Sequence, residues 1–427
     1  MEKATQIKAI IQVFDKRALK EKKDIDKFYH DTIKERMGNN DSPIDDLFEI
    51  CTTADNQSVP LLMGHRGCGK STELNKLKLR FEEEGFPVVI IDCNLETDLF
   101  NVNHFDILYL LFFSLLNIAE KNNISLDSKW VVEALQYFKS DISDVIIDDK
   151  NIKDVIGAGI NIPDFLKKIL PFFVDIKTEL QYNFSNSTVI KTKIERETKK
   201  CLGFINELRD RILFKLGKKP IIIFEDLDKI IPAERALDIF SYYVLGQMQF
   251  PVIYTFPISL SYTERFVDLE GIYEFLPLPM IKVKNREDNS ICIAGVESLK
   301  EIVFKRAEKK LFDENALQEL IVKTGGSIRD LFLCIIQSAK QARNRGSEKI
   351  EQQDVTIALN GLKADMTRRL ESKDENYEKL LSIHKNKTKI EDRESMLKFL
   401  RAHLVLEYNS ERWCDVHPLI LDFITNE

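Results

Sequence analysis

The chain has 427 residues, of which 44% are hydrophobic and 31% charged, so it can bury a core and is not disordered along its length. Its net charge of −7 argues against a surface coated in basic charge for nucleic acid, but does not exclude a local basic patch. Seven scattered cysteines without a CxxC pair argue against a disulfide framework or a zinc site, and favour the reducing cytoplasm.

Strands and helices alternate in the first part of the chain. Residues 1–57 predict a polar helical segment, 58–63 a buried strand, 70–84 an amphipathic helix and 86–93 a second strand. Residues 95–218 have a mostly helical pattern. Their apolar stretch at 105–119 carries Asp106 and is shorter than the ~18 residues that a membrane-spanning helix needs, so we expect a buried helix and no membrane contact.

Three further strands are predicted at 220–224, 251–256 and 275–283, with a helix at 233–247 between the first two. Strands that alternate with helices predict an α/β fold, with a parallel sheet covered on both faces. From about residue 296 the pattern is helical, and the end of the chain combines helices with a strand pair in the style of a small winged-helix module.

A glycine-rich loop follows the first predicted strand. Residues 64–71 are GHRGCGKS and match G-x-x-x-x-G-K-[ST] at every fixed position. Glycines let successive N–H groups turn toward phosphate oxygens, and the next helix aims its positive end at the same anion. In such a loop Lys70 contacts the β- and γ-phosphates, and the Ser71 hydroxyl ligates Mg²⁺. We therefore predict a nucleotide site at Gly64, His65, Arg66, Gly67, Cys68, Gly69, Lys70, Ser71 and Thr72.

Acidic residues end the strand at 220–224. In P-loop sites an acid at the strand tip holds Mg²⁺ and the next acid orients the attacking water. Here the tip is Glu225, followed by Asp226, and either could be the metal ligand. We favour Glu225 for the metal and Asp226 for the water. Asp228 and Lys229 are expected in a surface turn or a contact with a partner.

With these motifs in place, the chain resembles AAA+-type P-loop ATPases over roughly residues 25–365. The branch that it resembles contains origin-recognition initiator ATPases, archaeal-type ATPases and STAND switch ATPases. The strand end EDLD and the segment GGSIRDL at 325–331 are typical of that group. The resemblance implies an AAA+-like core over 58–285 with a helical insertion at about 100–215, a helical lid over 286–370 and a winged-helix-like module over 371–427.

The resemblance also implies roles for single residues. Arg329 matches the sensor-2 arginine that reaches from the lid to the γ-phosphate, and Thr255 is in the sensor-1 place on the strand after the acids. Arg265 lies where the family often carries an arginine finger for a neighbouring subunit's nucleotide. Tyr29 and Arg36 occupy the stretch that usually lines the adenine, and the preference for ATP over GTP comes from the resemblance alone.

Two features depart from the family. The gap between Lys70 and Glu225 leaves about a hundred residues for the insertion, and long extra segments tend to be functional. Its segment at 155–174 could cover the site, contact a partner or pack as core. A STAND protein carries an effector domain and a repeat sensor, and neither is visible here, so the effector of such a switch would be another chain.

The C-terminal module is acidic. Over 374–427 there are eight basic and eleven acidic residues, a net of 8 − 11 = −3. Phosphate contacts supply most non-specific DNA affinity, so a protein contact is favoured over DNA here, although Lys385, Lys387 and Lys389 cluster. Tyr408 and Trp413 are candidates for core or anchor residues.

The sequence thus predicts a cytoplasmic, Mg²⁺-dependent ATPase that couples nucleotide state to lid movement, self-association and recruitment of a separate protein partner. Lys70, Mg²⁺ and Arg329 would neutralise the charge of the γ-phosphate while an acid orients the water. Two alternatives stay open. One is a nucleotide-binding switch with little hydrolysis and a separate effector, for example in anti-phage (antiviral) defence, and the other is a DNA-stimulated initiator or transposition-type ATPase.

Overall fold

The computed structural model describes residues 2–15, 17–39, 41–53, 58–126, 130, 134, 188–370, 374–409 and 411–425. The apolar segment predicted at 155–174, and with it about half of the predicted insertion, lies outside these residues.

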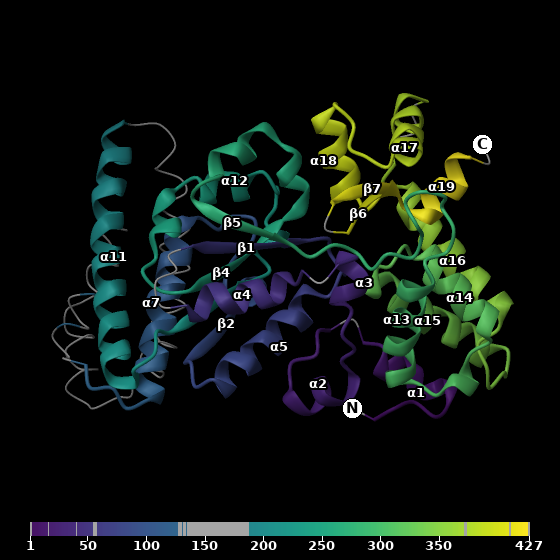
Figure 1. Cartoon of the computed structure of the whole chain (residues 1–427), viewed down its shortest axis with the longest axis horizontal. Helices are drawn as coiled ribbons and strands as arrows, with labels where there is room; N and C mark the ends of the chain where they lie inside the picture. Colours follow the sequence, from purple (N-terminus) through teal and green to yellow (C-terminus); the bar gives the residue numbers. More distant parts are fainter. Residues whose placement is uncertain are drawn as a thin grey trace.

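A five-stranded parallel sheet forms the centre of the first part of the chain (Figure 1). The strand order is β2-β3-β4-β1-β5, so one strand separates the strand before the glycine-rich loop from the strand that ends in acids. The parallel sheet predicted from the alternation of strands and helices is confirmed. Its strands are β1 (Val59–Gly64), β2 (Val88–Asp92), β3 (Ile221–Glu225), β4 (Val252–Pro257) and β5 (Tyr273–Pro277).

Both faces of the sheet are covered by helices, because successive side chains of a strand point to opposite faces. On β3, Ile222 and Phe224 enter one hydrophobic cluster, and Ile221 and Ile223 enter the other. The first cluster includes helices α7 (His104–Lys121), α11 (Thr188–Leu216) and α12 (Arg235–Phe240), and the second includes α4 (Pro43–Thr52) and α5 (Lys70–Glu83). A short helix, α6 (Cys93–Glu96), follows β2.

The helix α7 is the buried helix predicted from the apolar stretch at 105–119. Asp106, the acid in that stretch, starts the helix: its carboxylate accepts the Asn103 N–H (2.8 Å), while the Asn103 side chain accepts the Asp106 N–H (3.2 Å). This reciprocal capping satisfies two helix-end donors. In the described part of the chain, no helix combines the length and the apolar character needed to cross a membrane.

Two predicted elements differ from the structure. The strand expected at 275–283 ends at Pro277, because Pro277 and Pro279 have no N–H for the ladder. The helix expected at 233–247 is α12 followed by a 3-10 turn, η2 (Tyr243–Gln247). Tyr242 interrupts the helix with an extended backbone (ψ 93°) and stacks its ring on His104, with the ring centroids 3.7 Å apart.

The lid is helical, as predicted, and its core includes the start of the chain. It contains α13 (Ile293–Arg306), η5 (Lys309–Leu311), α14 (Glu314–Lys323), α15 (Ile328–Asn344) and α16 (Gln352–Thr367). The N-terminal helices are α1 (Ile7–Val13), α2 (Lys22–Phe28) and α3 (Ile33–Met37), and α1 lies against the lid (Figure 1). Phe14 packs edge-on against Phe332 of α15, at 5.1 Å between ring centroids. The first residues of the chain therefore help to hold the lid.

The C-terminal module consists of α17 (Asp374–Asn386), α18 (Arg393–Arg401), an antiparallel hairpin of β6 (Val405–Tyr408) and β7 (Trp413–Val416), and α19 (Pro418–Ile424). This arrangement agrees with the predicted winged-helix-like module. Tyr408 and Trp413 stack at 4.7 Å and are buried, so both are core residues. The module lies beside the lid, at the C-terminal end of the chain (Figure 1).

His417, in front of α19, gives the first prediction. Its Nδ1 accepts the Leu419 N–H (3.3 Å), and burial lowers the pKa of the imidazole from 6.5 to about 3. Because the unfolded chain takes up this proton first, stability is lost as the pH falls below about 6.5. Between about pH 7.5 and 5.5 the His417→Asn variant, which keeps a capping acceptor, should lose about 1.4 kcal/mol less free energy of unfolding than the unchanged chain.

Urea unfolding of the two chains at both pH values measures this difference. The carboxylates whose pKa values burial raises, such as Glu73 and Glu225, shift the stability of both chains alike and cancel in the comparison. Equal losses in the two chains would mean that His417 takes up its proton in the folded state.

Candidate nucleotide-binding site

The glycine-rich loop connects β1 to α5 in the geometry that the sequence predicts. Gly67 (φ 86°) and Gly69 (φ 106°) adopt backbone conformations that residues with a side chain rarely take. Lys70 is buried at the first position of α5 and donates to the carbonyl oxygens of Gly64 (2.8 Å) and His65 (3.1 Å). The loop thus folds around the lysine ammonium, with the N-terminus of a 14-residue helix beside it.

Asp228 is the third partner of this lysine, which corrects the expectation of a surface turn. Its carboxylate is buried and lies 3.0 Å from the Lys70 Nζ. The 3-10 turn η1 (Leu227–Lys229) after β3 brings it there. Burial alone would lower the pKa of Lys70, but Asp228, together with Cys68 and Asp226, more than offsets that effect and the pKa is raised. The lysine therefore stays charged, with each of its three N–H donors directed to an acceptor.

The two acids at the end of β3 lie in different surroundings. Burial raises the pKa of Glu225, and a hydrogen bond from Ser71 opposes the shift. The predicted metal ligands Ser71 and Glu225 are therefore in contact. Asp226 has a left-handed backbone (φ 71°) and pairs with Lys229 at 2.6 Å, while burial raises the pKa of its carboxyl group. The sequence predicts Lys229 in a surface turn or a contact with a partner, and its side chain is 40% exposed in the structure.

Thr255 lies on β4, next to these acids, and its hydroxyl is fully used by the backbone. It accepts the Leu227 N–H (3.0 Å) and donates to the Phe224 carbonyl (3.2 Å). Thr255 lines the same cavity as Glu225, so it is in the predicted place. In the structure, these two hydrogen bonds hold the turn that carries Glu225, Asp226 and Asp228.

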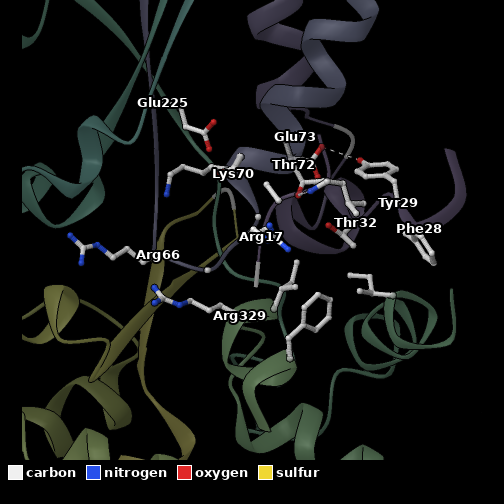
Figure 2. Close-up of a pocket in the computed structure, with 18 of the residues that line it drawn as sticks. Arg17, Phe28, Tyr29, Thr32, Arg66, Lys70, Thr72, Glu73, Glu225 and Arg329 are labelled. Atoms are coloured by element: carbon white, nitrogen blue, oxygen red, sulfur yellow. Dashed lines mark hydrogen bonds between the residues drawn. The ribbon is translucent and has the colours of Figure 1, made fainter. Parts of the chain in front are cut away.

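The lid closes over the loop through the start of α15. The Arg329 N–H points at the Gly67 carbonyl (3.4 Å), and a Cβ placed on Gly67 would be only 2.6 Å from the Arg329 Cβ. The side chains of Arg66 and Arg329 are exposed, and Figure 2 shows both extending toward the side of the Lys70 ammonium. Neither guanidinium makes an ion pair with a residue that the structure describes. Both are therefore available to an anion.

A cavity of about 420 Å³ lies between the loop, the acids and the lid, within the usual range for ligand pockets. One end is charged and contains Lys70, Ser71 and Glu225. Apolar and aromatic side chains from the N-terminal segment and the lid also line the cavity, beside the charged Arg36, Glu73 and Arg306, namely Ala18, Leu19, Phe28, Ile302, Ile328 and Phe332. A lining that combines charged groups with apolar and aromatic side chains suits a phosphorylated ligand with a flat ring system.

Tyr29 and Arg36, which the resemblance connects with the adenine, both line the cavity. The Tyr29 hydroxyl donates to Glu73 (3.0 Å), as the dashed line in Figure 2 shows. Arg36 is buried and donates to the Thr32 hydroxyl (2.7 Å), the Pro279 carbonyl (2.8 Å) and the Cys68 carbonyl (2.6 Å). Its guanidinium thus holds the glycine-rich loop in place, and Tyr29 is the freer of the two toward a ligand.

Four predicted residues are not among those that line the cavity, and the first of them, Gly64, contacts Lys70 through its carbonyl oxygen. Arg265 is on η4 (Glu264–Leu269), exposed, and paired with Asp238 at 2.7 Å. Cys68 is buried under the loop, which agrees with a small residue that fills a small space. The side chain of His65 turns away from the cavity and accepts the Glu407 N–H of β6 (2.9 Å).

Sequence reasoning missed several residues of the site. Glu73 is buried with a carboxyl pKa that burial raises, and its place three residues after Lys70 is a signal that could have found it. Arg306 is buried in the lid, and burial lowers the pKa of its guanidinium to about 10. It lies 4.9 Å from the ring centroid of Phe332, which also lines the cavity. Only tertiary packing brings Arg306 and Phe332 to the site.

No protein-family model and no curated protein matches the chain. Among solved structures it is similar to the Aeropyrum pernix ORC2 protein in ADPNP–ADP complexes, at 12% identity and a TM-score of 0.46 over 97% of this chain and 96% of that one. It is also similar to Cdc6p from Pyrobaculum aerophilum (13% identity, TM-score 0.41, 94% and 98% covered) and to Drosophila ORC bound to DNA (9% identity, TM-score 0.36, 99% and 91% covered).

Proposed function

We propose that the chain is a Mg²⁺-dependent ATPase of the AAA+ type that works in the cytoplasm. The observation that carries the proposal is the cavity in which Lys70, Ser71 and Glu225 meet Arg329 of the lid. A triphosphate in the charged end would contact the loop, the lysine and both exposed arginines. The seven cysteines are free thiols, which fits a reducing compartment.

The residues at the charged end fit a magnesium ion. Mg²⁺ is usually bound through one or two carboxylates together with substrate phosphates and water, and the adjoining Ser71 hydroxyl and Glu225 carboxylate supply that donor set. No cluster of three metal-binding side chains occurs in the described parts of the chain, so the protein alone would not enclose the ion. When bound, Mg²⁺ would neutralise charge on the β- and γ-phosphates.

The chain's own groups can then be assigned. Lys70, Arg66 and Arg329 stabilise negative charge on the γ-phosphate, and Asp226 orients the water for in-line attack. Thr255 holds the turn that positions Asp226. Since Arg329 belongs to the lid and Lys70 to the core, a triphosphate that contacts both couples its presence to the position of the lid. Part of this proposal is that the core, lid and C-terminal module divide as the sequence predicts, near residues 285 and 370.

Self-association is the second part of the proposal. Arg265 and its partner Asp238 are both exposed. An ion pair between exposed side chains contributes little to stability, so little free energy is needed to release Arg265 from it. A neighbouring copy could receive this guanidinium at its nucleotide. A separate protein partner is proposed for the acidic C-terminal module.

The test is phosphate release from the purified chain with ATP and Mg²⁺ over a range of protein concentrations. We expect turnover that rises more than linearly with protein and that disappears in Lys70→Ala. Lys78→Ala is the matched control, because Lys78 is on the same helix but half-buried at the surface and outside the cavity. Arg265→Ala should remove the part of the turnover that depends on protein concentration.

Other outcomes decide against parts of the proposal. Tight ATP binding without turnover would favour the switch with a separate effector, and turnover only with DNA would favour the initiator-type alternative. A chain that binds no ATP would overturn the proposal as a whole.

A further inference from the structure

The second residue of the glycine-rich loop is bound by the C-terminal hairpin. The His65 Nε2 accepts the main-chain N–H of Glu407 in β6 at 2.9 Å, across 342 positions of sequence. Both residues are buried, with 2% of His65 exposed and none of Glu407. The His65 ring also meets the edge of the His403 ring, with centroids 5.8 Å apart. The hairpin therefore lies directly against the phosphate-binding loop.

The same hairpin is anchored to the loop that follows β4. The Glu407 carboxylate accepts from Arg412 (2.8 Å) and from the hydroxyl of Tyr262 in η3 (Ile258–Tyr262). Arg412 also donates to the Ser261 hydroxyl (2.7 Å). Since β4 carries Thr255, which holds the acidic turn, one buried carboxylate connects the hairpin to the catalytic side of the sheet.

A third contact reaches the lid. The Tyr408 hydroxyl donates to the Gly325 carbonyl (2.9 Å), three residues before the first residue of the helix that carries Arg329. The Met280 N–H donates to the Glu407 carbonyl (3.1 Å) on the segment between β5 and the lid. Two residues of β6, Glu407 and Tyr408, thus touch the glycine-rich loop, the link to the lid and the turn before α15.

His65 also takes part in holding Lys70. Its carbonyl oxygen is one of three acceptors around the ammonium, together with the Gly64 carbonyl and Asp228. An ammonium has three donors, so a phosphate oxygen can bond to Lys70 only by displacing one of these acceptors. The hairpin holds His65, and the His65 carbonyl accepts a hydrogen bond from Lys70. This hydrogen bond therefore competes with phosphate for the lysine ammonium.

The hydrogen bonding of the His65 ring is also incomplete, which favours a contact that can open. Because Nε2 accepts, the ring proton is on Nδ1, and this buried atom has no hydrogen-bond partner among the described residues. An unpaired buried polar atom has a cost in free energy. Burial, and after it the positive charges of Lys70 and Arg412, lower the pKa of the imidazole to about 3, so the ring is neutral.

We propose that the C-terminal module reads the nucleotide state through this contact. The hairpin docked on His65 favours the lysine arrangement that competes with phosphate, and nucleotide binding loosens the hairpin. Coupling between two sites is reciprocal, so loosening the hairpin raises nucleotide affinity by the same factor. His65 is thus a positioning residue that acts through Lys70. This inference rests on the proposed function, since it assumes that the loop binds a nucleotide.

The hairpin carries its own probe. Trp413 of β7 is one of two tryptophans in the chain, so Trp130→Phe leaves it as the sole tryptophan. We expect a non-hydrolysable ATP analogue with Mg²⁺ to change the Trp413 emission, and the change to saturate together with the binding heat measured by calorimetry. Exchange of the β6 amides with deuterated water should become faster in the same complex.

Two variants test the coupling from opposite sides. His65→Leu removes the ring nitrogen that accepts the Glu407 N–H. Glu407→Gln weakens the bonds from the hairpin to Tyr262 and Arg412 and leaves the glycine-rich loop unchanged. Each should raise analogue affinity by at least about 5-fold, the lower end of typical coupling, and reduce the Trp413 response. His65→Gln, which keeps an acceptor, should restore both properties. The control is Lys385→Ala, an exposed change in the same module, which should alter neither.

The outcomes separate this inference from the proposed function. Analogue binding to the unchanged chain with no Trp413 response, or with affinities of both variants within two-fold of it, would overturn the coupling alone. Lower affinity in both variants would mean that the docked hairpin favours the bound nucleotide, and would also overturn it. No binding to the unchanged chain would overturn both.

Discussion

Replacing Asp226 with asparagine is expected to reduce ATP turnover by about 10²–10³-fold while ATP affinity changes only a few-fold. The reason is the geometry at the end of β3. Glu225 contacts Ser71, the residue that a P-loop uses for the metal, whereas Asp226 turns away on a left-handed backbone and pairs with Lys229. Asp226 is therefore the acid left to orient a water molecule. Single-turnover phosphate release, compared with calorimetric ATP binding, measures the two effects separately.

Glu225→Gln is the companion variant. If Glu225 holds the metal, this change should weaken binding of Mg²⁺ with ATP and raise the Mg²⁺ concentration needed for turnover, because a neutral amide is a poorer ligand for a hard cation. Extra Mg²⁺ should rescue Glu225→Gln in part and Asp226→Asn not at all. The reverse pattern of rescue would exchange the two roles.

The sequence predicts the parts of the site that are local. The loop at 64–71 and the acids after 220–224 are each contained in one short motif, and the structure places Lys70, Ser71 and Glu225 together. Asp228 was expected at the surface because the order EDLD does not reveal the 3-10 turn that folds it back onto Lys70. A turn of three residues depends on what packs around it, here the hydroxyl of Thr255 from another strand.

Contacts between distant segments had no signal in periodicity or composition. The resemblance connects Arg36 with the adenine, yet all three of its guanidinium nitrogens donate to other groups, among them the Cys68 carbonyl of the loop. The sequence analysis includes His65 in the nucleotide site because the glycine-rich motif binds phosphate through its backbone N–H groups. The motif does not specify where the side chain points, and here it meets β6. Both arise from tertiary packing.

Gly326→Ala is expected to destabilise the protein by about 3 kcal/mol or more, since it combines backbone strain with a clash. Gly326 has a positive φ of 83°, and a Cβ there would be 1.9 Å from the Ile281 carbonyl oxygen, which belongs to main chain and cannot swing aside. The residue lies between α14 and α15, next to Ser327, whose side chain caps the helix that carries Arg329. Any adjustment that relieves the clash must move the lid away from the segment after β5.

Gly346→Ala is the matched control for this prediction. Gly346 has a similar φ of 74°, but nothing lies within 4 Å of a Cβ placed on it. It should cost only the strain of the left-handed backbone, about 1–2 kcal/mol. Urea unfolding midpoints measure both variants, and the difference between them isolates the contact between Gly326 and Ile281. Similar midpoints would show that the lid does not approach the core this closely in solution.

A large difference would make Gly326 the point at which the lid is held. Nucleotide affinity should then fall in Gly326→Ala and stay unchanged in Gly346→Ala, because only the former displaces Arg329.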